Sequence, residues 1–193
     1  DERPYSFCSR TNLKRVLQTV RNNGYVFNVG MEPEHFLVTR DEDGSVRPWN
    51  PDGVDVLAKP CYDFRSMAPA MAYLQELTSA LNGLGWGVYQ TDHEDANGQF
   101  ETDFTYTDAL GMADRLVFFR LMANEIARKH GAFASFMPKP SANRTGSGAH
   151  YNMSLADRET GRNLFDPANG EDTYGCGVTQ MAYHFIAGVM KHA

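Results

Sequence analysis

Several features that mark other classes of protein are missing from this sequence. Its three cysteines, Cys8, Cys61 and Cys176, are widely spaced and form no Cys-x-x-Cys pair or Cys/His cluster of the zinc type. No apolar stretch approaches the roughly 18 residues that a membrane helix needs, and no basic segment followed by an apolar one stands at the start. We therefore expect reduced thiols, a cytoplasmic location and no membrane partner.

Basic residues are also scarce. The 18 Lys and Arg against 24 Asp and Glu leave a net charge of -6, without a run of basic residues that could follow a phosphate backbone. This excludes nucleic acid as an expected partner. The composition is otherwise globular, since 42% hydrophobic residues in a chain of 193 can bury a sizeable core. The chain begins without Met and ends inside an apolar helical pattern, so we expect it to be a fragment.

Hydrophobic periodicity predicts hairpins interspersed with helices. Helices are expected over 12–20 with Thr11 as the cap, 66–82, 107–130, and from about 178. Strands are expected over 25–39, 45–48, 86–95, 99–106, 132–138 and 149–155, with a loop over 50–65. The pattern indicates an α+β fold in which helices back a largely antiparallel sheet.

The first notable polar motif is Glu32-Pro33-Glu34, inside the expected strand 25–39. Residues two apart on a strand point to the same face, so the two carboxylates are expected to be neighbours. Pro33 cannot donate to a central ladder, which favours an edge or a bulge. A solvated strand face carrying two acids is the alternative.

A second acidic pair flanks Asn97-Gly98, a strong signal for a two-residue hairpin loop. That register places Glu94 opposite Glu101, and like charges across a ladder are destabilising unless something compensates them. Mg²⁺ or Mn²⁺ would do so, because both prefer oxygen ligands. The alternative is a longer turn with the acids in solvent. Three neighbours are further candidate ligands by composition, although Asp95 points to the opposite face: Asp92, His93 and Asp95.

Residues 139–148, here called the glycine-rich loop, connect two expected strands. They lack the Gly-Lys-Ser/Thr ending and the following helix of a Walker loop. Gly146 and Gly148 would still let the backbone approach a ligand closely, and Lys139 and Arg144 would favour an anion. An ordinary surface loop has a similar composition. His150, taken alone, is more often a structural histidine than a ligand.

Together these stretches resemble the glutamine synthetase family. The motifs are GMEPEHFLV at 30–38, DHEDANGQFE at 92–101 and KPSANRTGSGAHYNMS at 139–154. Their order and spacing make the resemblance specific. With KPCYD at 59–63 and AYHFIAG at 182–188, they are most similar to the branch that holds γ-glutamylmethylamide synthetase and the bacterial ligases named glutamine synthetase III.

The resemblance implies a set of site residues. Glu34, Glu94 and Glu101 would hold a first metal beside the substrate glutamate, so that Glu94 and Glu101 act as catalytic residues. Glu32 and His150 would hold a second metal near the phosphates of ATP. The nucleotide and glutamate contacts would come from five residues of one segment, with Gly146 against glutamate: Lys139, Gly146, Gly148, Asn152 and Ser154. Thr145 and Asn152 depart from residues common in the family, Asn and His.

The resemblance also implies a fold and an activity. The chain would be part of a catalytic domain with a curved sheet, lacking the small N-terminal β-grasp domain and the C-terminal part. The activity would be ATP-dependent ligation of the glutamate γ-carboxylate to ammonia or a small alkylamine, in a homo-oligomer such as a ring-forming dodecamer. The isolated fragment would be inactive. Two alternatives are a non-catalytic relative and a ligase for another amine, such as a polyamine.

Overall fold

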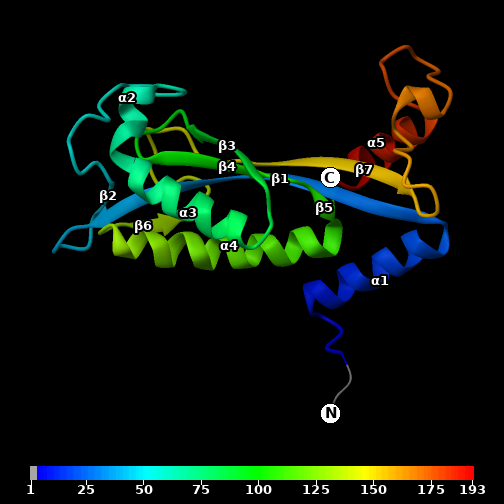
Figure 1. Cartoon of the computed structure of the whole chain (residues 1–193), viewed down its shortest axis with the longest axis horizontal. Helices are drawn as coiled ribbons and strands as arrows, with labels where there is room; N and C mark the ends of the chain where they lie inside the picture. Colours follow the sequence, from blue (N-terminus) through cyan, green and yellow to red (C-terminus); the bar gives the residue numbers. More distant parts are fainter. Residues whose placement is uncertain (1–3) are drawn as a thin grey trace. The chain divides into compact units, whose positions relative to one another are not determined.

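The computed structural model describes residues 4–193 (Figure 1). Its helices and strands follow the predicted order, with these bounds: α1 (Ser9–Asn22), β1 (Tyr25–Arg40), β2 (Val46–Pro48), α2 (Phe64–Met67), η1 (Ala68–Ala70), α3 (Met71–Gly83), β3 (Val88–His93), β4 (Gln99–Phe104), β5 (Thr107–Asp108), α4 (Ala109–Lys129), β6 (Phe133–Ser135), β7 (Ala149–Asp157), η2 (Pro167–Asn169) and α5 (Gln180–His192). Among these residues there is no helix with the length and apolarity needed to cross a bilayer.

The chain forms two compact units. The first contains residues 4–29, Tyr106–Ala113 and Asn152–Ala193, and the second contains Gly30–Thr105 and Asp114–Tyr151. All four glutamates of the predicted metal sites belong to the second unit, and so does His150. The candidate metal site can therefore be described within that unit alone.

The sheet of the second unit is built around β1. This strand runs antiparallel to β4 through Glu34–Phe36, to β6 through Phe36–Val38 and to β2 through Val38–Arg40, while β3 pairs with β4. The prediction of an antiparallel sheet is confirmed. Pro33 was predicted to mark an edge or a bulge, and the edge alternative is wrong, because β1 is a central strand. Pro33 lies directly beyond the end of the β4 ladder, where it need not donate a hydrogen bond to β4.

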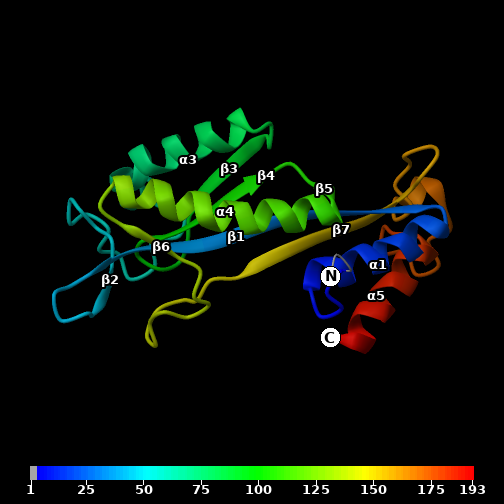
Figure 2. The ribbon, with the colours of Figure 1, turned by 90° about the horizontal axis from the view of Figure 1, so that it is seen from below.

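Alternation along β1 and β4 places the acidic side chains of the candidate site on the opposite face from His35, Phe100 and Phe104. On one face, His35 Nε2 lies 2.9 Å from the hydroxyl of Tyr73 on α3, and the Phe104 ring packs 5.9 Å from Phe119 of α4. Figures 1 and 2 show α3 and α4 along this face. The opposite parity carries the acids: Glu32, Glu34, Glu101 and Asp103. The candidate site therefore lies on the face that these helices leave open.

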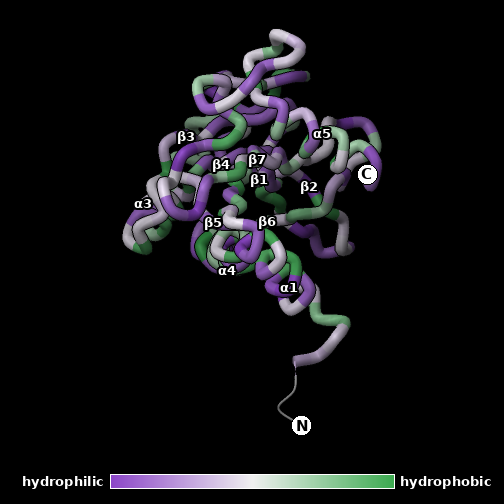
Figure 3. The backbone as a smooth tube through the Cα atoms, turned by 90° about the vertical axis from the view of Figure 1, so that its right-hand side faces the viewer, coloured by the Kyte–Doolittle hydropathy of each residue, from purple (hydrophilic) through white to green (hydrophobic). Residues whose placement is uncertain are grey.

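The two helices are amphipathic rather than wholly apolar. On α4, Phe119, Ala123, Ile126 and Ala127 are buried, which is the spacing of a single helix face. Figure 3 shows hydrophobic and hydrophilic residues intermixed along α4, as this arrangement requires. The longest helix was predicted over 107–130 and spans Ala109–Lys129, with the Asp108 carboxylate accepting the backbone N–H of Leu110 at 3.1 Å.

The first unit has its own packing. Its part of β1 pairs with β5 at Asn28↔Asp108, and β7 also pairs with β1. The ring of Phe185 on α5 lies 5.8 Å from Phe27 and 5.2 Å from Phe165. Thr179 caps α5 by accepting the N–H of Ala182.

Two helix boundaries differ from the prediction. Thr11 is not the cap of the first helix, because α1 begins at Ser9 and the carbonyl of Cys8 already accepts the N–H of Asn12 at 3.0 Å. The expected helix 66–82 is divided into α2, the 3₁₀ turn η1 and α3. Pro69 lies within η1 and lacks the N–H that a continuous helical ladder would use.

Candidate metal and nucleotide site

The hairpin that carries two of the predicted ligands has a different register from the one expected. His93 pairs with Phe100 and Asp92 with Glu101, while the N–H of Glu94 donates to Gln99 O at 2.9 Å. The loop is therefore the four residues 95–98 and not Asn97-Gly98 alone. The prediction that Glu94 lies opposite Glu101 is wrong, since Asp92 takes that place.

A buried carboxylate explains the longer loop. Asp55 Oδ1 accepts the side-chain amide of Asn97 at 2.7 Å, and Asp55 Oδ2 accepts the backbone N–H of Gly98 at 2.7 Å. Gly98 has a φ of 68°, and a Cβ there would lie 2.8 Å from the carbonyl oxygen of Leu37. The conformation of the loop is thus fixed by a residue more than 40 positions away in the sequence. Rules that predict turns from neighbouring residues do not take such a contact into account.

The same carboxylate pairs with His93, whose Nε2 lies 3.1 Å from Asp55 Oδ2. Burial alone would raise the pKa of Asp55, but hydrogen bonds from His93, Asn97 and Gly98 bring it below its ordinary value. Burial lowers the pKa of His93, yet Asp55 and the carbonyl of Glu94 outweigh burial and raise it. Both ring nitrogens of His93 are engaged, the second by Glu94 O at 2.8 Å, so His93 is not available as a metal ligand.

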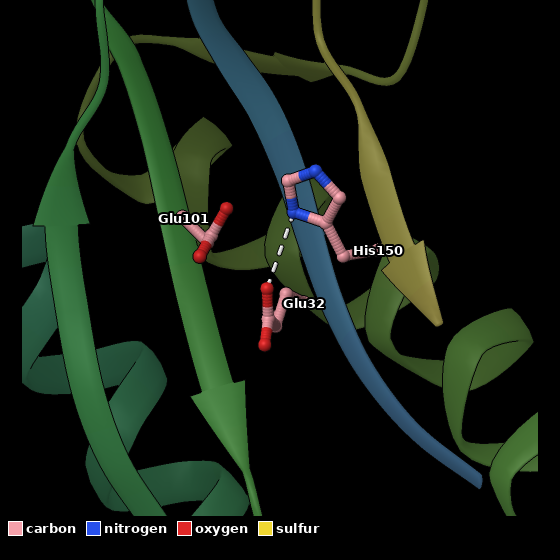
Figure 4. Close-up of side chains that lie close together, drawn as sticks. All are labelled: Glu32, Glu101 and His150. Carbon is pink, nitrogen blue, oxygen red and sulfur yellow. Dashed lines mark ion pairs between the residues drawn. The ribbon is translucent and has the colours of Figure 1, made fainter. Parts of the chain in front are cut away.

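Carboxylates from neighbouring strands meet on the open face of the sheet. Glu34 of β1 is the direct ladder partner of Glu101 of β4. One oxygen each of Glu32 and Glu101 and one nitrogen of His150 all lie within 4.8 Å of one another. His150 Nδ1 is 3.2 Å from Glu32 Oε2, and Figure 4 shows the three side chains converging from β1, β4 and β7. Glu32, Glu101 and His150 are thus brought together from three strands, with Glu34 at the adjacent ladder position, whereas the predicted sets had paired Glu101 with Glu34 and Glu94; the metal-binding role of these residues stays a prediction.

A second group shares Glu101. Oxygens of Asp92, Glu101 and Asp103 also lie within 4.8 Å of one another. Asp92 was a candidate by composition, whereas Asp103 was missed. The signal for Asp103 was available, because Glu101 and Asp103 are two apart on one strand and so share a face. Asp95 lies outside both groups, although the register from which its exclusion was argued is wrong, and it pairs with Thr145 Oγ1 at 2.8 Å and Lys59 Nζ at 3.3 Å.

The pKa values of Glu101, Asp103 and Glu94 are raised by burial first and by repulsion among the acids second. Burial, followed by the charges of Asp103, Glu94 and the β1 glutamates, raises the pKa of Glu101 to about 8. Burial and then the charges of Glu32 and Asp92 raise the pKa of Asp103 to about 6. The pKa of Glu94 is raised by burial and then by Glu34 and Asp92. The cluster therefore favours protonation or a cation.

The donor set fits a hard divalent cation. Carboxylate oxygens with one imidazole nitrogen are ligands that Mg²⁺ and Mn²⁺ accept. Asp103 is 4% exposed, and its Oδ1 has no hydrogen-bond partner among residues 4–193, which leaves a buried acceptor available. Glu94 belongs to neither three-residue group. It is near enough to Glu34 and Asp92 for their charges to raise its pKa.

The glycine-rich loop passes beside Glu34. A Cβ on Gly148 would lie 3.0 Å from Glu34 Oε1, and one on Gly146 would lie 2.5 Å from the carbonyl oxygen of Pro138. Both positions thus leave no room for a side chain without movement. Lys139 is exposed, with its Nζ donating to the carbonyl of Arg144 at 2.6 Å.

Asn152 and Ser154, the last two predicted nucleotide residues, follow on β7 within the first unit, where Asn152 is exposed and Ser154 is half-buried. The nucleotide role of both stays a prediction.

Comparison with known proteins adds independent information. A family model described as glutamine synthetase, catalytic domain, matches residues 6–193. The chain is 44% identical over 191 residues to the glutamate–methylamine ligase of Methyloversatilis universalis, and 39% identical over 193 residues to a glutamine synthetase of Rhizobium leguminosarum bv. phaseoli. These alignments cover 99% and 100% of this chain and 42% of each relative.

A solved structure described as "GmaS/ADP complex-Conformation 1" matches the fold with a TM-score of 0.89 at 40% identity. The match covers 100% of this chain and 42% of that one. A Plasmodium falciparum glutamine synthetase structure matches with a TM-score of 0.80 at 25% identity, over 98% of this chain and 41% of the other. The chain therefore spans about two fifths of the length of these relatives.

Proposed function

Because this chain belongs to the glutamine synthetase family, we propose that it forms part of an ATP-dependent ligase that joins the γ-carboxylate of glutamate to ammonia or a small alkylamine. The observation that carries the proposal is the convergence of Glu32, Glu101 and His150 from three strands, with Glu34 paired to Glu101. Carboxylates that repel one another on one sheet face lower the stability of the fold. A reaction that depends on a bound cation would explain why they are retained.

The proposed metal ligands fall into two sets. Glu34, Glu94 and Glu101 would hold one Mg²⁺ or Mn²⁺, and Glu32 and His150 would hold another. When bound, such ions neutralise phosphate charge and align the attacking and leaving oxygens in phosphoryl transfer. Glu94 and Glu101 are the proposed catalytic residues, because they would border the reacting carboxylate.

The glycine-rich loop would hold the substrates. Gly146 and Gly148 present backbone with no side chain to obstruct a ligand, and Lys139 supplies a positive charge for phosphate. Asn152 and Ser154 would contact the nucleotide from β7. A nucleotide site is supported by the similar solved structure that is named as a complex with ADP.

The proposed reaction has two steps. A γ-carboxylate oxygen of glutamate attacks the γ-phosphorus of ATP, ADP leaves, and γ-glutamyl phosphate forms. The amine nitrogen then attacks the carbonyl carbon, the carbon–oxygen bond to phosphate breaks, and the nitrogen loses a proton. The residues around the site must keep water from the acyl phosphate until the amine arrives.

The test is an ATP-dependent phosphate-release assay on the full-length protein with glutamate and a panel of ammonia, methylamine, ethylamine and a diamine. We expect stimulation by ammonia or a small monoamine, with the amide product identified by mass spectrometry. Stimulation by the diamine alone would indicate a polyamine ligase. No stimulation by any amine would indicate a non-catalytic relative and contradict the proposal.

A matched pair of variants connects the activity to the site. Glu101→Gln removes one buried carboxylate of the cluster, and we expect activity to fall at least about 100-fold, because loss of a direct ligand should cost at least the upper end of the about 10–100-fold typical of losing an outer-shell partner. Glu125→Gln makes the same change where the side chain is 61% exposed on α4, and should leave activity unchanged. Equal activities of the two variants would argue against the site.

The proposal extends to the setting of the protein. The three cysteines are free thiols, which suits a reducing compartment such as the cytoplasm. We also propose a homo-oligomer, a ring-forming dodecamer by family resemblance. Light scattering on the full-length protein tests this, and a monomer would contradict it.

A further inference from the structure

Gln99, the first residue of β4, is fully buried on the acidic side of the sheet. A buried primary amide has two donors and an acceptor to satisfy, so its partners define its position. Gln99 finds them on three separate segments of the second unit. It is the point at which β1, the loop 95–98 and the glycine-rich loop are connected.

The contacts of Gln99 are specific in direction. Its Nε2 donates to Glu34 Oε2 at 2.7 Å, to the carbonyl oxygen of Gly146 at 3.1 Å and to Ser147 Oγ at 3.3 Å. Its Oε1 accepts the backbone N–H of Ala96 at 3.1 Å. One amide group therefore binds a proposed metal ligand and the proposed glutamate-binding backbone at the same time.

The second oxygen of Glu34 is constrained from the other side. Gly148 approaches so closely that a Cβ there would lie 3.0 Å from Glu34 Oε1. The Glu34 carboxylate thus lies between the Gln99 amide and the backbone of the glycine-rich loop. Displacing either neighbour would alter where both carboxylate oxygens point.

Only an uncharged donor of this length suits the position. A lysine or arginine would neutralise Glu34 and compete with a cation, and a glutamate would repel it at 2.7 Å. The amide fixes the orientation of Glu34 by a charge-assisted hydrogen bond while leaving its negative charge in place. Metal sites commonly use such neutral partners to orient a ligand.

We propose that Gln99 is a positioning residue that couples Glu34 to the glycine-rich loop, so that cation binding at Glu34 and glutamate binding at Gly146 stabilise the same arrangement. This inference rests on the proposed function. It goes beyond it by assigning one buried amide to both binding events and by predicting that the two are energetically linked.

The variants are Gln99→Met, which keeps side-chain length and removes all hydrogen bonds, and Gln99→Glu, which keeps the acceptor for Ala96 and, when ionised, removes the donors, so its kinetics are measured at pH 9. Gln75→Met at an exposed position of α3 is the control. On the full-length protein we would measure the glutamate KM, kcat, the Mn²⁺ dissociation constant without nucleotide, and thermal unfolding in EDTA.

For Gln99→Met we expect the Mn²⁺ dissociation constant and the glutamate KM both to rise about 10–100-fold, with a smaller change in kcat. Gln99→Glu should not rescue the KM, because the donors are what the coupling uses. The control should change neither quantity. A folded Gln99→Met with both constants within threefold of the parent, or recovery of the KM in Gln99→Glu, would overturn the inference.

Hydrogen exchange of the parent protein provides a test that needs no variant. Adding Mn²⁺ alone should slow hydrogen exchange of the backbone amides of residues 146–148 at least threefold. Mn²⁺ bound at Glu34 would restrict the motion of Gln99, and Gln99 in turn would restrict the motion of the glycine-rich loop. Unchanged exchange in a protein that binds Mn²⁺ would overturn the coupling and leave the proposed function intact. A parent that binds no Mn²⁺ would contradict the proposed function, and this inference with it.

Discussion

Replacing Glu101 with glutamine should stabilise the metal-free protein while weakening cation binding at the proposed metal site. In the folded state Glu101 is 8% exposed, and burial and the surrounding acids raise its pKa from 4.5 to about 8. One pKa unit corresponds to about 1.4 kcal/mol, so ionising this carboxyl in the folded protein costs up to about 4–5 kcal/mol. Because Asp103 shares this repulsion, we expect neutralisation at Glu101 alone to recover about 2 kcal/mol.

The effect must depend on pH in one direction. Below the ordinary pKa of 4.5, Glu101 is protonated in both the folded and unfolded protein, and glutamine brings no advantage. As pH rises toward 8, the unfolded state ionises first and is favoured, so the parent loses stability relative to the variant. Above about pH 8 the difference reaches its plateau.

Thermal unfolding of the full-length protein in EDTA between pH 5 and pH 9 measures this difference. The midpoint of Glu101→Gln should exceed that of the parent at pH 8.5 and approach it at pH 5. Glu125→Gln, with its exposed side chain, should follow the parent throughout. Mn²⁺ should raise the midpoint of the parent and have less effect on Glu101→Gln. Lower stability of Glu101→Gln at pH 8.5 in EDTA, or an equal gain at both pH values, would refute the reasoning.

Two glycines give further predictions. Gly148→Ala needs no left-handed backbone but sets a Cβ 3.0 Å from Glu34 Oε1, so Mn²⁺ affinity measured by titration should fall about tenfold with the midpoint in EDTA unchanged. Unaltered affinity would contradict this contact. Gly98→Ala should destabilise the protein by about 1–3 kcal/mol more than Gly131→Ala. Both positions have positive φ, but a Cβ at 98 meets Leu37 O at 2.8 Å and one at 131 meets nothing within 4 Å. Denaturant midpoints compare the two, and equal losses would count against a rigid loop at Gly98.

What was predictable from sequence is what short-range geometry controls. Strand alternation sufficed to place Glu32 and Glu34 on one face, because a period of two is a property of the strand itself. The same rule places Asp103 on the face of Glu101. Asp103 was not predicted as a site residue, because the prediction considered only acids that face each other across the hairpin. The predicted bounds of α3 and α4 were also close to the observed ones, because both helices follow the apolar periodicity of the sequence.

What sequence rules missed depends on distant partners. The hairpin register was predicted from Asn97-Gly98, but Asp55 binds both residues from 42 and 43 positions away and makes the loop longer. The residues next to Asn97 and Gly98 in the sequence give no sign of this hydrogen bonding to Asp55. The meeting of His150 with Glu32 is likewise long-range, and only family resemblance indicated it before the structure placed the two atoms 3.2 Å apart.

Asp55 and Glu101 are both buried acids of this unit, but the first stabilises the fold and the second belongs to the candidate site. Asp55 is buried with a paired histidine and hydrogen-bond donors, so its pKa falls and its charge is compensated within the protein. Glu101 is buried among other acids, so its pKa rises, and a bound cation would compensate its negative charge. The first carboxylate fixes the loop that carries the second group into place. The hydrogen bonds of Asp55 thus help to offset the stability lost at Glu101, and the metal-free protein can remain folded around a cluster whose charge is relieved by protonation or by a cation.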